Sequence, residues 1–278
     1  MNYTTHIKAK TGWFDIDIKE LIRYKDLIYL FFKRNYTTRY KQTILGPLWL
    51  ILNPLITVVL YAFVFGRLAG LSAEGIPSFV FYLCSNALWT FFSTSLTQTA
   101  NTFTANAAVM GKVYFPRLVM PISSVLTGML DFVIQIGMLI IVMIGYAISG
   151  VRFNLGLSLI TVPFIILQAG ILGLGCGIII ASLTTKYRDL AILVGFGVQL
   201  WMYASPVVYT SSLIPEKYRW LYMLNPMAPI MECWRSATIG SGEFLYGYWG
   251  ISWAITLVIF LFGVLIFSKV EKTFMDTV

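Results

Sequence analysis

The placement of charged residues constrains the fold of this chain more than any other feature of its sequence. Between Gln42 and Ser268 the sequence contains six long apolar stretches, and Asp131 is the only acidic residue inside any of them. A helix needs roughly 20 apolar residues to cross a bilayer core about 30 Å thick. Hydrophobic residues make up 58% of the chain and charged residues 12%, so the composition excludes a soluble domain. We therefore predict an all-α integral membrane protein with six transmembrane helices.

The apolar stretches divide the chain into two parts. Residues 1–42 form a cytoplasmic leader, and residues 43–278 form the transmembrane domain. Each stretch is long enough for one crossing, since an α-helix rises about 1.5 Å per residue. We place the spanning helices near residues 46–66, 77–98, 118–147, 155–183, 190–209 and 248–268.

The segment between the last two spans, residues 211–247, is too long for a tight turn and too apolar for a solvated loop. Its three prolines interrupt any long helix. We predict two short helices, near 214–223 and 228–239, that pack into or dip back toward the outer membrane face. Irregular backbone at that depth must be satisfied by protein or by a wet cavity, so we interpret the segment as an outer gate. The gate residues are Trp220, Pro226, Pro229 and Trp234.

Lysine and arginine are distributed unequally between the two predicted sides. Nine of the 20 lie at or before Lys41. Two more lie in each of the segments 112–117, 186–188 and 269–272 on the same side, whereas the other side holds five. The positive-inside rule therefore places both termini in the cytoplasm. Because the positive charge is concentrated beside the first span, we expect lipid headgroups rather than nucleic acid as its neighbours.

The leader contains a helix with one apolar face. Asp17 and Glu20 have the spacing of a capping box at its start, and apolar residues follow at helical spacing. We expect this helix to lie in the inner headgroup layer, where it either sets the topology or forms part of a docking surface for a cytoplasmic partner. Its interface residues are Ile18, Leu21, Arg23, Ile28 and Phe32.

The sequence offers no set of residues for catalysis. His6 is the only histidine, and the three cysteines have no metal-binding spacing. The pair Gly111-Lys112 lacks both the earlier glycine and the following serine or threonine of a P-loop. We therefore predict that the chain is not an enzyme and has no catalytic, cofactor-binding or metal-binding residue of its own. If ATP drives it, the nucleotide and its Mg²⁺ bind a separate subunit.

Asp131 is the one ionisable side chain expected at membrane depth. Such a carboxyl group is a functional hypothesis by default, and it could carry a proton in an ion-coupled carrier. The other interpretation is a neutral or hydrogen-bonded side chain, satisfied by Ser, Thr or Asn of another helix. An isolated carboxylate without a basic partner favours the second interpretation.

Gly173 and Gly177 form a GxxxG pattern, which lets another helix approach closely. We interpret this pattern as packing within the helix bundle. Six helices in 278 residues are few for a wide conduit, so we expect a homodimer that encloses a central path.

Five motifs stand out along the chain: Arg39–Trp49, Asn53-Pro54, Lys112–Arg117, Lys186–Leu190 and Leu224–Ile230. Their order and spacing resemble those of the membrane subunits of ATP-binding-cassette exporters that move polysaccharides. These transport subunits are the O-antigen, capsule and teichoic-acid permeases. The resemblance covers nearly the whole chain, and its specificity comes from the combination of motifs.

The resemblance implies a function. Two copies would form a channel in the bacterial inner membrane, two ATP-binding subunits would dock beneath it, and a lipid-linked polysaccharide would be exported. O-antigen is the first expectation for the cargo, with capsule or teichoic acid as others. The coupling helix would lie in the inner loop 99–117, flanked by the leader helix. The implied docking residues are Asn101, Thr102, Asn106, Lys112, Phe115, Arg117, Lys186 and Arg188.

The family also suggests a role for the abundant aromatic residues. Sugar rings present apolar C–H faces, and Tyr or Trp offers a flat apolar face with a polar tip. The resemblance would place aromatic residues of the first, second and fifth spans near the channel. The residues of this possible glycan path are Tyr61, Trp89, Phe92, Trp201 and Tyr203.

Three other functions remain open. One is an ATP-driven exporter of a drug or a small lipid, which would use the same machine with another cargo. Another is an ion-coupled secondary carrier that uses Asp131. A membrane-embedded transferase is the weakest alternative, because the sequence offers no acid, base and nucleophile together.

Overall fold

A computed structural model describes residues 18–41, 45–71, 73–110, 112, 115–184 and 189–277. Across these residues the chain forms helices joined by turns and loops, with no strand. In chain order the elements are α1 (Ile18–Arg23), α2 (Lys25–Tyr40), η1 (Gly46–Leu48), α3 (Trp49–Tyr61), the π-helical η2 (Ala62–Leu68), α4 (Ser78–Ala100), α5 (Thr102–Met110), α6 (Val119–Ile148), η3 (Leu157–Thr161), α7 (Val162–Thr184), α8 (Leu190–Tyr203), η4 (Ser211–Leu213), α9 (Glu216–Tyr222), α10 (Met227–Ile239) and α11 (Tyr246–Thr277).

The predicted membrane spans are confirmed, with one difference. Five helical segments of the described chain are long and apolar enough to cross a membrane: Gly46–Leu68, Ser78–Ala100, Val119–Ile148, Leu157–Thr184 and Tyr246–Lys269. The sixth, α8, has 14 residues, so it is about 21 Å long and shorter than a bilayer core. The prediction of a helix that continues to residue 209 is therefore wrong in length.

Proline explains why α8 ends early. Pro206 has no backbone N–H to donate, and its ring would clash with the carbonyl of Met202 in a continued helix. The exposed end is instead satisfied by other parts of the chain. The Tyr209 hydroxyl donates to the Tyr203 carbonyl at 2.9 Å, and Asn225 Nδ2 donates to the Ala204 carbonyl at 3.1 Å.

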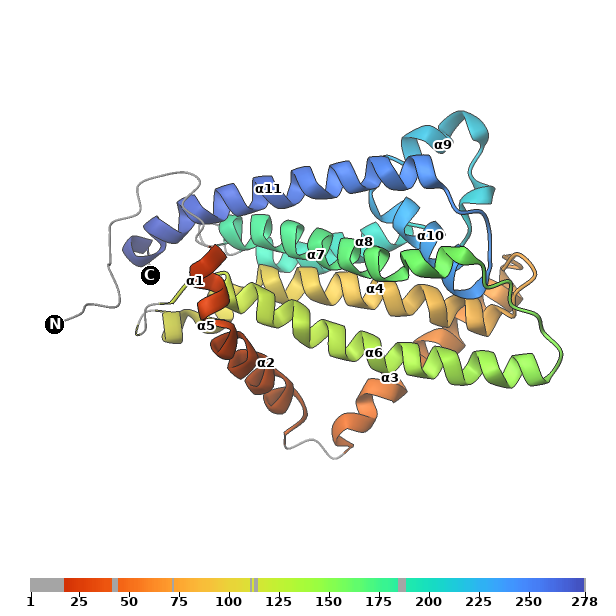
Figure 1. The fold of residues 1–278 in the computed structure, drawn as a ribbon, viewed down its shortest axis with the longest axis horizontal. Helices are drawn as coiled ribbons and strands as arrows, with labels where there is room; N and C mark the ends of the chain where they lie inside the picture. Colours follow the sequence, from red (N-terminus) through yellow and green to blue (C-terminus); the bar gives the residue numbers. More distant parts are fainter. Residues whose placement is uncertain are drawn as a thin grey trace.

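The first span is irregular. It begins with the 3₁₀ turn η1, contains Pro54 inside α3, and finishes as the seven-residue π-helix η2. Each of these features weakens the regular hydrogen-bond ladder of an α-helix. In Figure 1 the start of α3 leans away from the other long helices.

The long helices α4, α6, α7 and α11 run along the length of the molecule, as Figure 1 shows. One end of the bundle holds α1, α2, α5 and the last turns of α11, and we name it the leader end. The opposite end holds α9, α10 and the segments 69–71, 73–77 and 149–156, and we name it the α10 end.

The core is built around α4. Sixteen of its 23 residues are buried, and it packs against α6, α7, α10 and α3. The GxxxG interpretation is confirmed, because a Cβ atom on Gly177 would lie 2.5 Å from Thr99 Cβ and one on Gly173 would lie 2.9 Å from Ser95 Cβ, both on α4. On the other side of α7, a Cβ on Gly175 would lie 2.9 Å from Phe260 Cα of α11.

The leader forms two helices rather than the single one predicted. Tyr24 separates α1 from α2, with backbone angles φ −91° and ψ 18°. The second helix packs against α6. Its buried residue is Phe31, which belongs to an apolar cluster at the leader end together with Phe103, Phe115 and Phe267.

Two helices leave most of their apolar surface uncovered. In α3 only Leu50, Pro54 and Val58 are buried, and in α8 only Met202 is buried. By contrast α4, between them, is buried along most of its length. The uncovered sides of α3 and α8 therefore face lipid or another protein chain.

Candidate functional site

The predicted docking segment, α5, is joined to the leader by a side-chain hydrogen bond. Arg34 Nη2 of α2 donates to Asn106 Oδ1 of α5 at 2.7 Å. Asn106 Nδ2 in turn donates to the Thr102 carbonyl at 3.0 Å, which orients the amide group. The two helices are therefore in direct polar contact, so that a displacement of α5 would stretch or break its hydrogen bond to α2.

Aromatic contacts strengthen the same junction. The Phe31 and Phe115 rings lie 5.6 Å apart and are each 5% exposed. The Arg34 guanidinium lies 4.7 Å from the Phe31 ring centroid, a cation–π distance. Phe103 of α5 stacks on Phe267 of α11 at 5.0 Å. The leader, α5 and the end of α11 thus form one packed unit.

The other predicted docking residues differ in exposure. Asn101 and Lys112 are exposed, Arg117 is half-buried, and Thr102 is buried with its hydroxyl donating to the Gln98 carbonyl at 3.2 Å. The structure therefore brings Asn106, Thr102 and Phe115 into contacts and leaves Asn101 and Lys112 on the surface. The predictions for Lys186 and Arg188, like His6 and the capping residue Asp17, lie outside the described residues.

The interface helix has a different buried face from the one predicted. Leu21 and Ile28 pack partly against the leader-end cluster as expected. Arg23 is exposed at the end of α1, Phe32 is half-buried, and Ile18 begins α1.

Sequence reasoning missed Phe31. The signal was present, because residues 24, 27, 28 and 31 follow the helical spacing of three and four once the helix is restarted at Tyr24. If one helix continues from residue 18, the residues at helical spacing on its apolar face include Phe32 rather than Phe31.

Asp131 of α6 has a basic partner that the sequence did not indicate. Arg39 Nη1, near the end of α2, donates to Asp131 Oδ2 and forms an ion pair with it. The Asp131 side chain is 8% exposed and the Arg39 side chain 43%. The expectation of an unpaired carboxylate satisfied by a neutral residue is therefore wrong. Arg39 and Asp131 are 92 positions apart in the sequence and meet because α2 packs against α6. The linear sequence therefore does not show that they are partners.

Three of the predicted path aromatics form one packed cluster. The Phe92 ring lies 5.1 Å from Trp201 in an edge-to-face arrangement and 5.3 Å from Trp89. Trp89 and Phe92 are buried inside the single chain, whereas Trp201 is half-buried. Tyr61 is half-buried, with its hydroxyl donating to Met202 Sδ at 3.4 Å, and Tyr203 is exposed. The uncovered aromatic surface in this group is therefore carried by Tyr203 and by parts of Tyr61 and Trp201.

The α10 end contains a buried ion pair. Arg235 Nη2 donates to Glu232 Oε1 at 2.6 Å, and both residues lie on α10. Arg235 is 0% exposed and Glu232 is 4% exposed. Arg235 Nη1 also donates to the Pro206 carbonyl, and the guanidinium lies 4.7 Å from the Phe81 ring of α4. The pair therefore fastens α10 to α4 and to the chain that follows α8.

Further hydrogen bonds close the α10 end. The Ser211 backbone N–H donates to Glu232 Oε1 at 2.8 Å. Ser241 Oγ donates to Glu74 Oε2 at 3.0 Å, which joins the end of α10 to the connection after the first span. Trp201 Nε1 donates to Asn225 Oδ1 at 2.9 Å. These contacts draw together residues from four connections between helices.

The predicted gate residues differ in exposure, one lying on the surface and three inside the packed α10 end. Trp220 on α9 is 59% exposed. Pro226, Pro229 and Trp234 are buried, and Trp234 Nε1 donates to the Cys84 carbonyl of α4 at 2.9 Å. The two short helices are found where the sequence placed them. In this structure α10 is a part of the core and α9 is a surface helix.

Burial raises the pKa of two side chains at the α10 end, Tyr222 and Cys233, and so favours their neutral forms. Burial raises the pKa of the Tyr222 hydroxyl, and its hydrogen bond to Tyr209 at 3.1 Å raises it further. Burial also raises the pKa of the Cys233 thiol to about 12. Among the described residues, no three His, Cys, Asp or Glu side chains converge in a way that could hold a metal ion. The site is one of packing and ion pairing.

Apolar spans, a packed leader and two short helices at the α10 end define a multi-pass helical membrane protein. The family profile described as ABC-2 type transporter matches residues 26–239. The chain therefore belongs to the ABC-2 type transporter family.

The comparison with characterised proteins agrees with this family. The chain is 30% identical over 253 residues to an O-antigen export system permease protein RfbA of Klebsiella pneumoniae, covering 90% of this chain and 94% of the relative. A second RfbA of the same organism is 31% identical over 252 residues. An RfbA of Myxococcus xanthus is 28% identical over 222 residues, or 79% of this chain and 82% of the relative.

Proposed function

We propose that this chain is the permease subunit of an ATP-driven exporter that moves a lipid-linked polysaccharide, O-antigen in the first instance, out of the cytoplasm. The near-complete coverage of proteins named as O-antigen export permeases supports the cargo class. The chain would act without an ATPase site of its own, and a separate subunit would bind ATP and Mg²⁺.

The observation that carries this proposal is the packed unit at the leader end. Arg34 joins α2 to Asn106 of α5 at 2.7 Å, and Phe31 contacts Phe115 at 5.6 Å. An ATPase subunit that pushes on α5 would thereby move the leader. The leader would in turn pull on α6 through the ion pair of Arg39 and Asp131. Exposed Asn101 and Lys112 lie where such a partner would dock.

A homodimer completes the channel in this proposal. The uncovered apolar sides of α3 and α8 include Ile56, Val59, Ile192 and Phe196, each more than half exposed. Exposed apolar surface of this extent is typical of an interface with lipid or protein. The short α8 is easier to accommodate beside another copy than alone, because it does not span the bilayer core by itself.

The orientation follows from the basic residues. The leader end would face the cytoplasm, so both termini would lie inside and the α10 end would face outward. The exposed helix α9 would be the moving part of the outer gate, because α10 is held by the buried pair of Glu232 and Arg235.

The experiment is deletion of the gene in its host, followed by analysis of surface polysaccharide and of lipid-linked intermediates. The proposal predicts that the polysaccharide disappears from the surface while its lipid-linked form accumulates inside. Restoration by the wild-type gene is the control. Normal surface polysaccharide together with increased sensitivity to a drug would favour the exporter of small molecules and contradict the proposal.

A further inference from the structure

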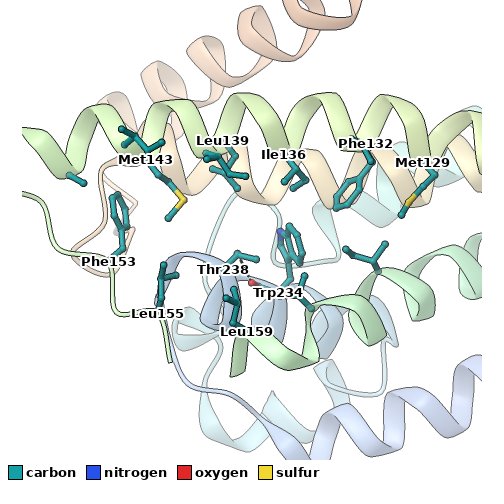
Figure 2. A pocket seen from close by; sticks show the side chains of 16 residues that line it. Met129, Phe132, Ile136, Leu139, Met143, Phe153, Leu155, Leu159, Trp234 and Thr238 are labelled. Carbon is teal, nitrogen blue, oxygen red and sulfur yellow. Dashed lines mark hydrogen bonds between the residues drawn. The ribbon is translucent and has the colours of Figure 1, made fainter. Parts of the chain in front are cut away.

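An apolar pocket of about 520 Å³ lies between α6, the segment that leads into α7, and α10 (Figure 2). The labelled side chains of α6 point toward Trp234 and Thr238 of α10. Phe153 and Leu155 lie toward one end of the pocket, and Leu159 lies across it from Leu139. None of the lining residues is charged, and Thr238 is the only one with a polar side chain besides Trp234. The Thr238 hydroxyl already donates to the Trp234 carbonyl at 2.6 Å.

The pocket is unsuited to water. A buried water needs two to four polar partners, and large apolar cavities stay dry. The Trp234 indole N–H is also occupied, since it donates to the Cys84 carbonyl at 2.9 Å. An apolar ligand is therefore the one that the lining favours.

The mouth of the pocket opens to the side of the bundle. Val133, Ile140 and Ile144 of α6 are each more than half exposed, whereas Phe132 and Leu139 are 2% exposed. Exposed apolar residues thus form the rim and buried ones form the floor. On a membrane-spanning helix such a rim faces hydrocarbon, so the pocket is open to lipid rather than to solvent.

The dimensions fit one lipid chain. A cavity of about 150 Å³ holds a benzene ring, so about 520 Å³ corresponds to three or four such rings, or about 20 carbon atoms. The lining runs along α6 from Met129 to Ala147, a length of about 27 Å at the rise of an α-helix. A long, narrow shape of this size suits a single acyl chain and is too small for a long isoprenoid tail.

A positively charged residue adjoins Phe153, at one end of the pocket. Arg152 immediately precedes Phe153 and is exposed. The connection 149–156 is fixed against α10, because a Cβ on Gly240 would lie 2.6 Å from the Asn154 carbonyl oxygen. Arginine binds phosphate through charge-assisted hydrogen bonds, so this position suits a phosphate headgroup.

We propose that the pocket binds one acyl chain of an anionic glycerophospholipid, with the headgroup phosphate next to Arg152. The acyl chain contacts Trp234 and Thr238 of α10, the helix that also carries the buried ion pair of Glu232 and Arg235. Lipid binding therefore supports the packed α10 end from the bilayer side. This inference does not depend on which cargo the protein exports.

The test uses the full chain in nanodiscs of phosphatidylglycerol that contain a small fraction of phosphatidylglycerol with a diazirine in one acyl chain. After illumination, mass spectrometry locates the labelled residues. We expect label on Phe132 and Leu139, which bulk lipid does not reach because they are 2% exposed. Label confined to freely exposed residues such as Ile141 would overturn the proposal.

A matched pair of variants on α6 tests the pocket itself. Ile140 lines the pocket and Ile141 does not, and they are 52% and 71% exposed. We expect Ile140→Trp to lower labelling of the floor several-fold and Ile141→Trp to leave it unchanged. Equal labelling in both, in protein with wild-type thermal stability, would contradict the proposal. If Ile140→Trp fails to fold, Ile140→Phe takes its place.

Two further comparisons identify the occupant. Arg152→Gln is expected to reduce labelling of the floor several-fold, and Arg152→Lys is expected to retain it. Equal labelling in the two variants would exclude an anionic headgroup.

Displacement of the label by an equal mole fraction of polyprenyl phosphate would identify an isoprenoid tail instead. A disulfide between two Ile140→Cys chains would identify a second copy, and either result would overturn the proposal.

Discussion

Arg39 at the end of α2 and Asp131 in α6 form an ion pair across 92 positions of the sequence. The Asp131 side chain is 8% exposed and the Arg39 side chain is 43% exposed. The negative charge of Asp131 within the apolar span is therefore compensated by a residue of the leader. The pair gives the leader a direct attachment to a transmembrane helix. In the proposed function, this attachment would transmit movement of the leader to α6.

Asp131→Leu should lower the stability of the protein. The change leaves Arg39 without its carboxylate partner beside the span, and partial exposure of Arg39 limits the cost to about 1–3 kcal/mol. Thermal unfolding in detergent, followed by loss of the monodisperse peak, measures the effect. In a double-mutant cycle with Arg39→Gln we expect a coupling energy of about 1 kcal/mol. A coupling energy of zero would show that the pair contributes nothing.

The same residue separates two functions. Asp131→Asn removes the ionisable group but keeps an acceptor for Arg39, so ATP-driven export should be largely retained. An ion-coupled carrier that uses Asp131 would lose proton-linked transport in this variant. Transport measured with ATP and with a pH gradient, each alone, distinguishes the two.

Arg235→Ala should be among the most destabilising substitutions in the chain. It leaves the buried Glu232 carboxylate without its cationic partner, with the Ser211 N–H as its remaining donor, and breaking a fully buried pair costs about 3–5 kcal/mol. Arg235→Lys should recover only part of this loss, because lysine lacks the planar fork that reaches Glu232 and the Pro206 carbonyl together. Lys217→Ala is the control, since Lys217 is exposed on α9. Equal melting temperatures of Arg235→Ala and Lys217→Ala would contradict the structure.

Gly177→Ala should disrupt the packing of α7 on α4. The new Cβ would lie 2.5 Å from Thr99 Cβ and 2.8 Å from the Leu96 carbonyl oxygen, so one of the two backbones must move. Gly137→Ala on α6 is the matched control, because nothing lies within 4 Å of its added Cβ. Alanine is about 1 kcal/mol better than glycine inside a helix, so the control should be neutral or stabilising. Yield of folded protein and melting temperature report the difference.

Single-cysteine labelling tests the orientation. We expect Glu216→Cys on α9 to react with a membrane-impermeant maleimide in intact cells and Lys112→Cys to react only in inverted vesicles. The native Cys233 should stay silent, because burial raises the pKa of its thiol to about 12 and the thiolate is the reactive form. Wild-type protein is the control. Reaction of Lys112→Cys from outside would reverse the topology.

Much of the fold could be predicted because the bilayer limits the choices. Apolar length set the positions of the spans, and the prolines of 211–247 predicted α9 and α10 to within a few residues. The close approach of another helix at Gly177 also followed from local sequence, since only a small residue permits it, whereas the structure identifies that helix as α4. These features depend on neighbours along the chain or on the membrane.

The features that were missed depend on contacts between distant segments. Arg39 and Asp131 meet only because the leader folds back onto α6, and the linear sequence shows them as separate charges. The early end of α8 has a local cause, Pro206. The apolar residues that follow Pro206 nevertheless favoured a longer helix in the sequence. The hydrogen bond from the distant Asn225, which satisfies the end of α8, is visible only in the structure. The burial of Phe31 required knowledge of the break at Tyr24.

The most direct test of the account is ATP-dependent transport in proteoliposomes that contain this chain with and without its ATPase subunit. With both subunits present, the account predicts ATP hydrolysis and movement of lipid-linked polysaccharide across the membrane. The chain alone should neither hydrolyse ATP nor transport. Asn106→Ala, which removes the acceptor of Arg34, should lower transport more than hydrolysis. Robust ATP hydrolysis by the chain alone, or transport driven by a pH gradient without ATP, would contradict the account.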